Sequence, residues 1–241
     1  MSLRKDRTTP RRLMPRSIAA AMIASACLLT APPAAAELVV SQLIVEFKPG
    51  APKASDIELS NDSPERSYVL VEAREIVNPG TPLERKVTSP DPAKLGLLVS
   101  PARFILEPQQ RRTLRIATIG APSERERVYR VTVKPVTGAL DSSDTGLKLL
   151  VGYDLLVLAR PATIRSEVRV ARSGRELTLT NAGNASVELA EGQQCDEKGG
   201  ACVKLPGKRL YAGASWTQTL PRAAGGEYRL RSTDGWSSLK F

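Results

Sequence analysis

Short stretches in which apolar and polar residues alternate make up most of the chain. Examples are DIELSN at residues 56–61, VTVKPV at residues 131–136 and ELTLTN at residues 176–181. Clusters of Gly, Pro, Asn, Asp and Ser, such as KPGAP and NPGTP, separate these stretches and favour turns. A period of two places successive side chains on opposite faces of a strand, and no window sustains a helical period. The pattern therefore predicts an all-β protein of many short strands, with β-sandwiches favoured over a barrel.

The longest apolar run, LKLLVGYDLLVLARP at residues 147–161, marks the end of the first of two predicted domains. The chain then passes through a proline-containing break at residues 160–162 before alternation resumes. We therefore predict an N-terminal domain at residues 37–160 and a smaller C-terminal domain at residues 161–241.

Residues 1–36 have the composition of a secretory signal peptide. Six Lys or Arg residues and one Asp lie in the first 16 positions, an Ala-rich apolar run follows, and the small residues PPAAA precede Glu37. The apolar run is shorter than the roughly 20 residues that a transmembrane helix needs. We therefore expect an exported protein whose mature chain begins near Glu37 and has no membrane span.

Most of the positive charge belongs to this leader. The whole chain has 35 basic and 25 acidic residues; without the six basic and one acidic residue of the leader, 29 and 24 remain, a net charge near +5. The remaining basic residues are scattered and few aromatic residues lie among them, which is unlike a nucleic-acid-binding surface. We therefore expect no nucleic-acid partner.

Cys195 and Cys202 flank a Gly-Gly turn, and in an exported protein such a pair is expected to form one disulfide. The chain has no histidine, which excludes Ser-His-Asp and Cys-His catalysis and leaves the two cysteines without partners for zinc. DSSDTG at residues 141–146 resembles a calcium loop but lacks the bidentate glutamate. We predict no enzyme activity, no metal and no cofactor, and a protein that acts by binding.

The run at residues 147–161 carries more apolar surface than a strand with one core face needs. One of its faces comprises Leu147, Leu149, Val151, Tyr153, Leu155 and Val157. In one interpretation, the strand passes from edge to core and the second domain covers it. In the other, its leading half is an exposed edge that lends backbone hydrogen bonds and apolar side chains to a partner's incomplete sheet. Because exposed apolar edges promote aggregation, keeping one favours the second interpretation.

Four segments, in this order, resemble the first domain of the periplasmic pilus (fimbrial) chaperones. They are IELSND at residues 57–62, VSPARFILEPQQRRTLRI at 99–116, RVYRVTVKPV at 127–136 and the apolar strand that ends in Arg160 and Pro161. The likeness covers residues 37–161, and the C-terminal domain matches in size, position and strand character. The resemblance implies two immunoglobulin-like β-sandwich domains.

The resemblance also implies a mechanism. In this family the last strand of the first domain, the donor strand, completes the unfinished sandwich of a pilus subunit. The chaperone keeps that subunit soluble in the periplasm and passes it to an outer-membrane usher without ATP. By position relative to Pro161, the subunit-binding residues of this chain would be Leu147, Leu149, Val151 and Tyr153.

One departure from the family pattern concerns the terminal carboxylate of the subunit. Well-known members anchor it with an Arg of the first strand and a Lys of the last. Here Leu43 and Ile44 stand nearest the Arg position, and Asp154 stands about where the Lys would be. We therefore expect a divergent, alternate or archaic-type branch, with an anchor that the sequence does not identify. The alternative function is an exported structural or adhesive β-sandwich protein, such as a pilus subunit or surface component.

Overall fold

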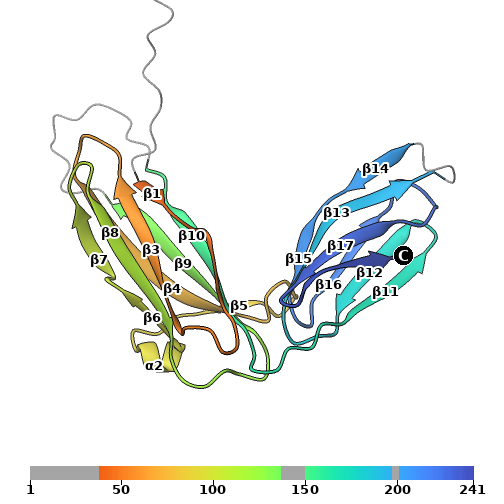
Figure 1. The fold of residues 1–241 in the computed structure, drawn as a ribbon, viewed down its shortest axis with the longest axis horizontal. Helices are drawn as coiled ribbons and strands as arrows, with labels where there is room; N and C mark the ends of the chain where they lie inside the picture. Colours follow the sequence, from red (N-terminus) through yellow and green to blue (C-terminus); the bar gives the residue numbers. More distant parts are fainter. Residues whose placement is uncertain (1–37, 137–149, 197–200) are drawn as a thin grey trace, which may run out of the picture. The chain divides into compact units, whose positions relative to one another are not determined.

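The computed structural model describes residues 38–136, 150–196 and 201–241, and its regular structure is almost entirely β-strand (Figure 1). The predicted signal peptide and the DSSDTG segment lie outside the described residues. By their contacts, Ala36–Phe241 form one unit. Within the described ranges, no helix has the length and apolar character to cross a membrane.

The first β-sandwich is built from two sheets. One has the strand order β1-β3-β8-β6, and the other has the order β2-β10-β9-β4-β5, with β7 also paired to β4. The strands of the first sheet are β1 (Leu38–Val40), β3 (Ala54–Asn61), β8 (Arg111–Thr118) and β6 (Leu97–Ser100). Those of the second are β2 (Ile44–Phe47), β10 (Tyr153–Ala159), β9 (Arg127–Val136), β4 (Ser67–Val77), β5 (Arg85–Val87) and β7 (Arg103–Leu106). A single helical turn, α2 (Pro92–Leu95), precedes β6 and is capped by the Asp91 side chain.

The alternating residues of these strands fill the space between the two sheets. Ile57 and Leu59 of β3 face Val131 of β9 and Leu155 of β10 in one core cluster, and all four are fully buried. Removing a side chain of this size from water is worth about 1.5–3 kcal/mol. The period of two that predicted the strands is thus the period that fills the core.

The second β-sandwich has its own core. Its sheets have the orders β11-β12-β16 and β14-β13-β17-β18, with β15 also paired to β13. The strands are β11 (Val168–Ser173), β12 (Glu176–Asn181), β16 (Ser215–Thr219), β14 (Cys202–Leu205), β13 (Val187–Cys195), β17 (Glu227–Ser232), β18 (Gly235–Lys240) and β15 (Lys208–Leu210). Leu177, Leu179, Leu189 and Tyr228 form the centre of this cluster. The predicted fold class, all-β with two immunoglobulin-like sandwiches, is confirmed.

Each sandwich ends an inner strand on a buried asparagine that ties down the following turn. Asn61, at the end of β3, donates from its amide to the carbonyls of Glu65 and Leu106 at 2.7 and 3.1 Å. Asn181, at the end of β12, donates to the carbonyls of Ala185 and Leu210, each at 2.9 Å. Satisfying buried carbonyls in this way stabilises a turn that has no ladder partner.

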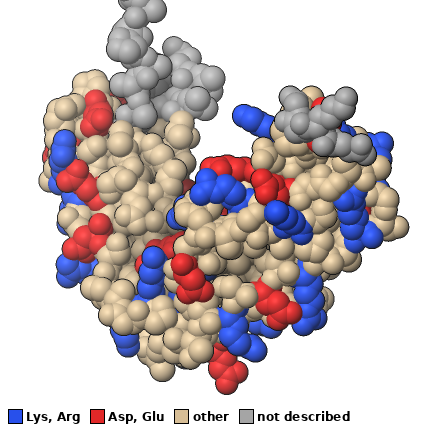
Figure 2. Space-filling view, turned by 45° about the vertical axis from the view of Figure 1, so that its right-hand side comes forward, with Lys and Arg blue, Asp and Glu red and all other residues tan. Residues whose placement is uncertain are grey.

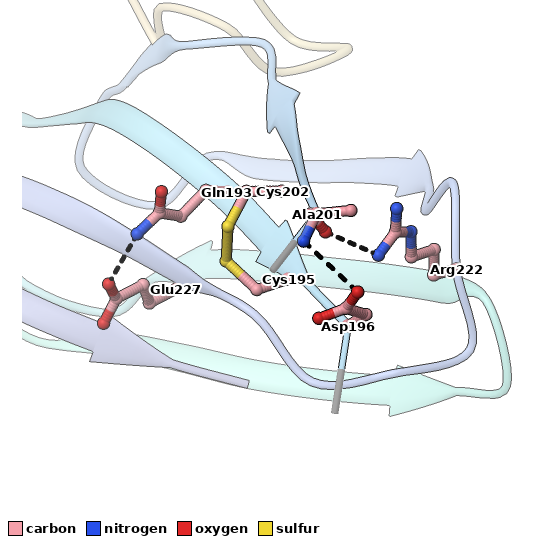
Figure 3. Close-up of a disulfide and its surroundings, with 7 residues drawn as sticks. All are labelled: Gln193, Cys195, Asp196, Ala201, Cys202, Arg222 and Glu227. Carbon is pink, nitrogen blue, oxygen red and sulfur yellow. Dashed lines mark hydrogen bonds between the residues drawn. A yellow bond between two sulfur atoms is a disulfide. The ribbon is translucent and has the colours of Figure 1, made fainter. Parts of the chain in front are cut away.

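The predicted disulfide between Cys195 and Cys202 is present and joins β13 to β14 (Figure 3). The two cysteines lie directly opposite each other in the strand pair. Beside them, Arg222 donates to the Ala201 carbonyl at 2.8 Å. The buried Gln194 donates to the Ala224 carbonyl at 2.6 Å. The disulfide hairpin is therefore fastened to the loop that leads into β17.

Candidate partner-binding edge

Strand β10 has a neighbour on both sides only along its second half. β9 pairs antiparallel with the whole of β10. On the other side, β2 pairs in parallel with residues 156–159, and the Leu156 N–H donates to the Leu43 carbonyl at 2.9 Å. Backbone groups alternate sides along a strand, so those of Asp154 also face the β2 side. Within the described residues, no strand pairs with this leading part of the β10 edge.

The open edge results from the division of the first strand between the two sheets. β1 pairs with β3 in one sheet, and the Ser41 N–H still donates to Glu58 there at 2.9 Å. The chain then crosses to the other sheet, and the register of β2 with β10 begins at Ile44. Because the crossing occupies the preceding residues, β2 reaches β10 too late to cover its first half.

The core-facing row of β10 continues into solvent at Val151. Leu155 and Val157 are buried in the first core, and Tyr153 packs against it. Val151, two residues earlier on the same side of the chain, is 60% exposed. Leu147 and Leu149 lie outside the described residues, so their role in binding stays a prediction.

Tyr153 contacts the protein's own sandwich. Its side chain is half-buried, and its hydroxyl donates to the Leu38 carbonyl of β1 at 2.8 Å. This bond links the two sheets at the end of the sandwich. Of the predicted subunit-binding residues that the structure describes, Val151 is the one with a freely exposed side chain.

Leu43 and Ile44 add apolar surface along the same edge. Their exposed fractions are 53% and 41%, and both lie where β2 first meets β10. Exposed aliphatic side chains beside an unpaired strand edge are the combination that strand addition uses. The chemistry of this edge therefore fits an incoming β-strand with an apolar face.

A basic cluster surrounds Asp154 on the outer face of this sheet. Arg74 Nη2 and Thr132 Oγ1 donate to Asp154 Oδ1 at 2.9 and 3.1 Å. Arg130 Nη1 lies 3.8 Å from Asp154 Oδ2. One carboxylate thus faces two guanidinium groups. Sequence reasoning missed this cluster because its members come from β4, β9 and β10.

Beyond these local pairs, charge is mixed across the surface. Figure 2 shows acidic and basic side chains interspersed on the face that it presents, with neither sign gathered into one broad patch. Such a distribution gives little of the one-signed field that steers a nucleic acid.

A buried ion-pair network stands at the other end of β10. The Arg160 guanidinium donates to the Glu126 carboxylate, to Glu46 at 3.1 Å and to the Ser186 carbonyl at 3.0 Å. Burial raises the pKa of the Glu126 carboxyl, and the Arg160 charge partly offsets this rise. Because Ser186 directly precedes β13, the network connects the end of β10 to the second sandwich.

Residues 37–165 match the family described as pili and flagellar-assembly chaperone, PapD N-terminal domain. Among curated relatives, a fimbrial protein of the CS1 system of Escherichia coli is 24% identical over 213 residues, covering 84% of this chain and 88% of that protein. The probable fimbrial chaperone LpfB of Escherichia coli O157:H7 is 34% identical over 95 residues, covering 38% of this chain and 40% of that protein.

Solved structures share the fold across both sandwiches. The class 5 fimbriae chaperone CfaA superposes with a TM-score of 0.64 at 22% identity, over 84% of this chain and 98% of CfaA. The pre-assembly complex of the chaperone CsuC with the tip adhesion subunit CsuE, from Acinetobacter baumannii, contains a chain that superposes with a TM-score of 0.58 at 13% identity, over 85% and 98% of the two chains. At these identities the likeness establishes the architecture. Because the family match runs from residue 37 to residue 165 of a 241-residue chain, the protein belongs to the pili and flagellar-assembly chaperone family.

Proposed function

We propose that this protein is a periplasmic chaperone that caps pilus subunits by donor-strand complementation and delivers them to an outer-membrane usher without ATP. Its family is one of pilus assembly chaperones. The predicted signal peptide supports export, and the complex of CsuC with CsuE is a precedent for a chaperone that holds a pilus subunit.

The observation that carries the proposal is the unpaired leading edge of β10. Its outer backbone groups have no strand partner among the described residues, and its core-facing row continues to the exposed Val151. Burying Leu147, Leu149 and Val151 in a subunit would supply about 5–9 kcal/mol of gross apolar transfer free energy. Ordering the donor segment reduces this gain, and added main-chain hydrogen bonds lengthen the lifetime of the complex.

The basic cluster offers a cationic site for the subunit's terminal carboxylate, in place of the family's usual Arg and Lys. Arg74 is hydrogen-bonded to both Thr132 and Asp154. Arg130 is only 3.8 Å from Asp154, which is longer than a hydrogen bond. Within the proposal, Arg130 therefore takes the incoming carboxylate while Arg74 holds Asp154.

The alternative, an exported pilus subunit or surface component, fits the first sandwich less well. A pilus subunit lacks the last strand of its sandwich, whereas β10 occupies the last position of this one and pairs with β9 and β2. The structure gives no comparable observation in favour of a subunit role.

Co-purification tests the proposal. Replacing Leu149 and Val151 with Glu places charge where a subunit core would receive apolar side chains, so we expect at least a tenfold loss of the β-rich partner that co-purifies from periplasmic extract. Val170→Glu is the matched control, because Val170 is an exposed valine of a strand in the second sandwich. Circular dichroism should show all variants folded. Undiminished partner recovery with the double variant would show that this strand is not the donor.

A further inference from the structure

A short gap interrupts one edge of β4 in the first sandwich. On this edge, β7 pairs with residues 67–70 and β5 pairs with residues 75–77. Between them, Glu72, Ala73 and Arg74 have no strand partner on this side within the described residues, while β9 pairs with them on the other. Three residues of strand span about 10 Å. The gap is therefore as long as a short extended peptide.

The backbone of Ala73 faces this gap. The Val71 N–H donates to the Ala102 carbonyl on the gap side at 2.8 Å. Since backbone groups two residues apart point to the same side of a strand, the N–H and C=O of Ala73 also point into the gap. One donor and one acceptor on a single residue are the pair that an antiparallel strand bonds.

The side chain of Ala73 points inward, toward a crevice between the two sheets. Ala73 packs against the rim of the first core. The crevice has a volume of about 550 Å³, which lies within the range of pockets that hold ligands. The apolar part of its lining consists of Val71, Ala73, Pro90, Leu95, Leu97 and Val99. It can therefore receive an aliphatic side chain from a residue bonded opposite Ala73.

The outer rim of the gap carries cations that lack a partner. Lys86 of β5 lies opposite Ile76 and Arg103 of β7 lies opposite Leu70, so both share the outer face with Arg74. Lys86 and Arg103 are exposed. No ion pair of either is found in the described part of the chain. Next to Arg74 and Lys86, an incoming acidic side chain meets two positive charges.

Glu72 sets the direction of the incoming chain. Its carboxylate lies on the outer face, where Lys134 binds it at 2.7 Å, so an acidic residue opposite Glu72 would be repelled. β5 and β7 both run antiparallel to β4. A strand that continues this arrangement passes Arg74 first, then Ala73, then Glu72.

We propose that this gap is a second strand-binding site, at which the protein accepts an extended segment of a partner protein in which an acidic residue directly precedes an aliphatic one. The acidic residue lies opposite Arg74 and beside Lys86. The aliphatic residue bonds to the Ala73 backbone and fills the crevice. This site differs from the leading edge of β10, where the protein donates a strand, and it does not depend on the donor-strand proposal.

A labelled peptide tests the site in the full-length protein. We expect a fluorescein-labelled pentapeptide, Ser-Asp-Val-Thr-Ser, to bind saturably in a polarisation titration. The reversed peptide, Ser-Thr-Val-Asp-Ser, has the same composition but places its acid opposite Glu72, so it should bind at least tenfold more weakly. Absence of saturable binding up to millimolar concentration, or equal binding of the two peptides, would overturn the proposal.

Two substitutions at Ala73 locate the binding. Ala73→Pro removes the N–H that faces the gap and leaves the pairing with β9 intact, as proline requires in a strand. Ala73→Leu keeps the N–H but fills the crevice, so it supplies the test if the proline variant unfolds. Each should weaken the peptide at least tenfold, whereas Val151→Glu should leave its affinity unchanged. Full affinity in a folded Ala73 variant, or its loss in Val151→Glu, would refute the assignment to this gap.

Discussion

At the scale of single residues, Glu126 and Arg160 show how burial and pairing oppose each other. Both side chains are nearly inaccessible to water. A buried carboxylate is costly unless hydrogen bonds and an opposite charge compensate it, and here Arg160 and Ser186 do so only in part, because Glu126 Oε1 has no hydrogen-bond partner among the described residues. The pKa of Glu126 is consequently raised above its ordinary value of 4.5.

This raised pKa predicts a pH dependence that Glu126→Gln should remove. In the folded state Glu126 binds its proton more tightly than in the unfolded chain. Its ionisation therefore destabilises the fold above the raised pKa, and that cost disappears as pH falls toward 4.5. Relative to Glu126→Gln, the wild type should gain stability between pH 7 and pH 5, measured by urea unfolding. A difference that stays constant, or that changes in favour of the variant as pH falls, would contradict the shift.

At the scale of secondary-structure elements, the β13–β14 hairpin depends on contacts at its base. The disulfide between Cys195 and Cys202 closes a short loop, and Gln194, which is fully buried, bonds the loop that precedes β17. Both features hold one end of the second sandwich together.

Removing the disulfide should therefore destabilise the second sandwich without touching the donor edge. For a loop this short, the chain-entropy model gives about 2–3 kcal/mol. We expect the Cys195→Ala, Cys202→Ala variant to lose about this much free energy of unfolding in urea, while partner co-purification below the transition is unchanged. Wild-type stability in the variant would argue that the bridge does not restrict the unfolded chain.

The disulfide and the strand character of β10 could be predicted from sequence because both depend on neighbours in the chain. Cys195 and Cys202 flank one turn, and the apolar row of β10 alternates visibly. By contrast, the division of the first strand and the bond between Arg74 and Asp154 depend on which distant strands become neighbours. No local pattern encodes that pairing.

At the scale of the whole molecule, the two sandwiches have separate hydrophobic cores. The first contains Ile116 and the second contains Leu179, and the two clusters share no residue. This separation supports our proposal that residues 37–160 and 161–241 are distinct domains.

If the two domains unfold separately, a cavity in one core should move one thermal transition. Leu179→Ala should cost about 2–5 kcal/mol and lower only the transition of the second domain in differential scanning calorimetry. Ile116→Ala is the matched variant for the first. A single transition that both variants lower equally would show that the two sandwiches unfold as one cooperative unit.

The crossing of the first strand from one sheet to the other has a consequence for how tightly a guest is gripped. The crossing point sets how much of β10 is left without a neighbour. Moving it two residues toward the amino terminus would let β2 occupy one more pair of backbone groups and shorten the vacant stretch accordingly. Related chaperones can thus adjust their hold on different guests by sliding this crossover, with every side chain of the lent strand left as it is.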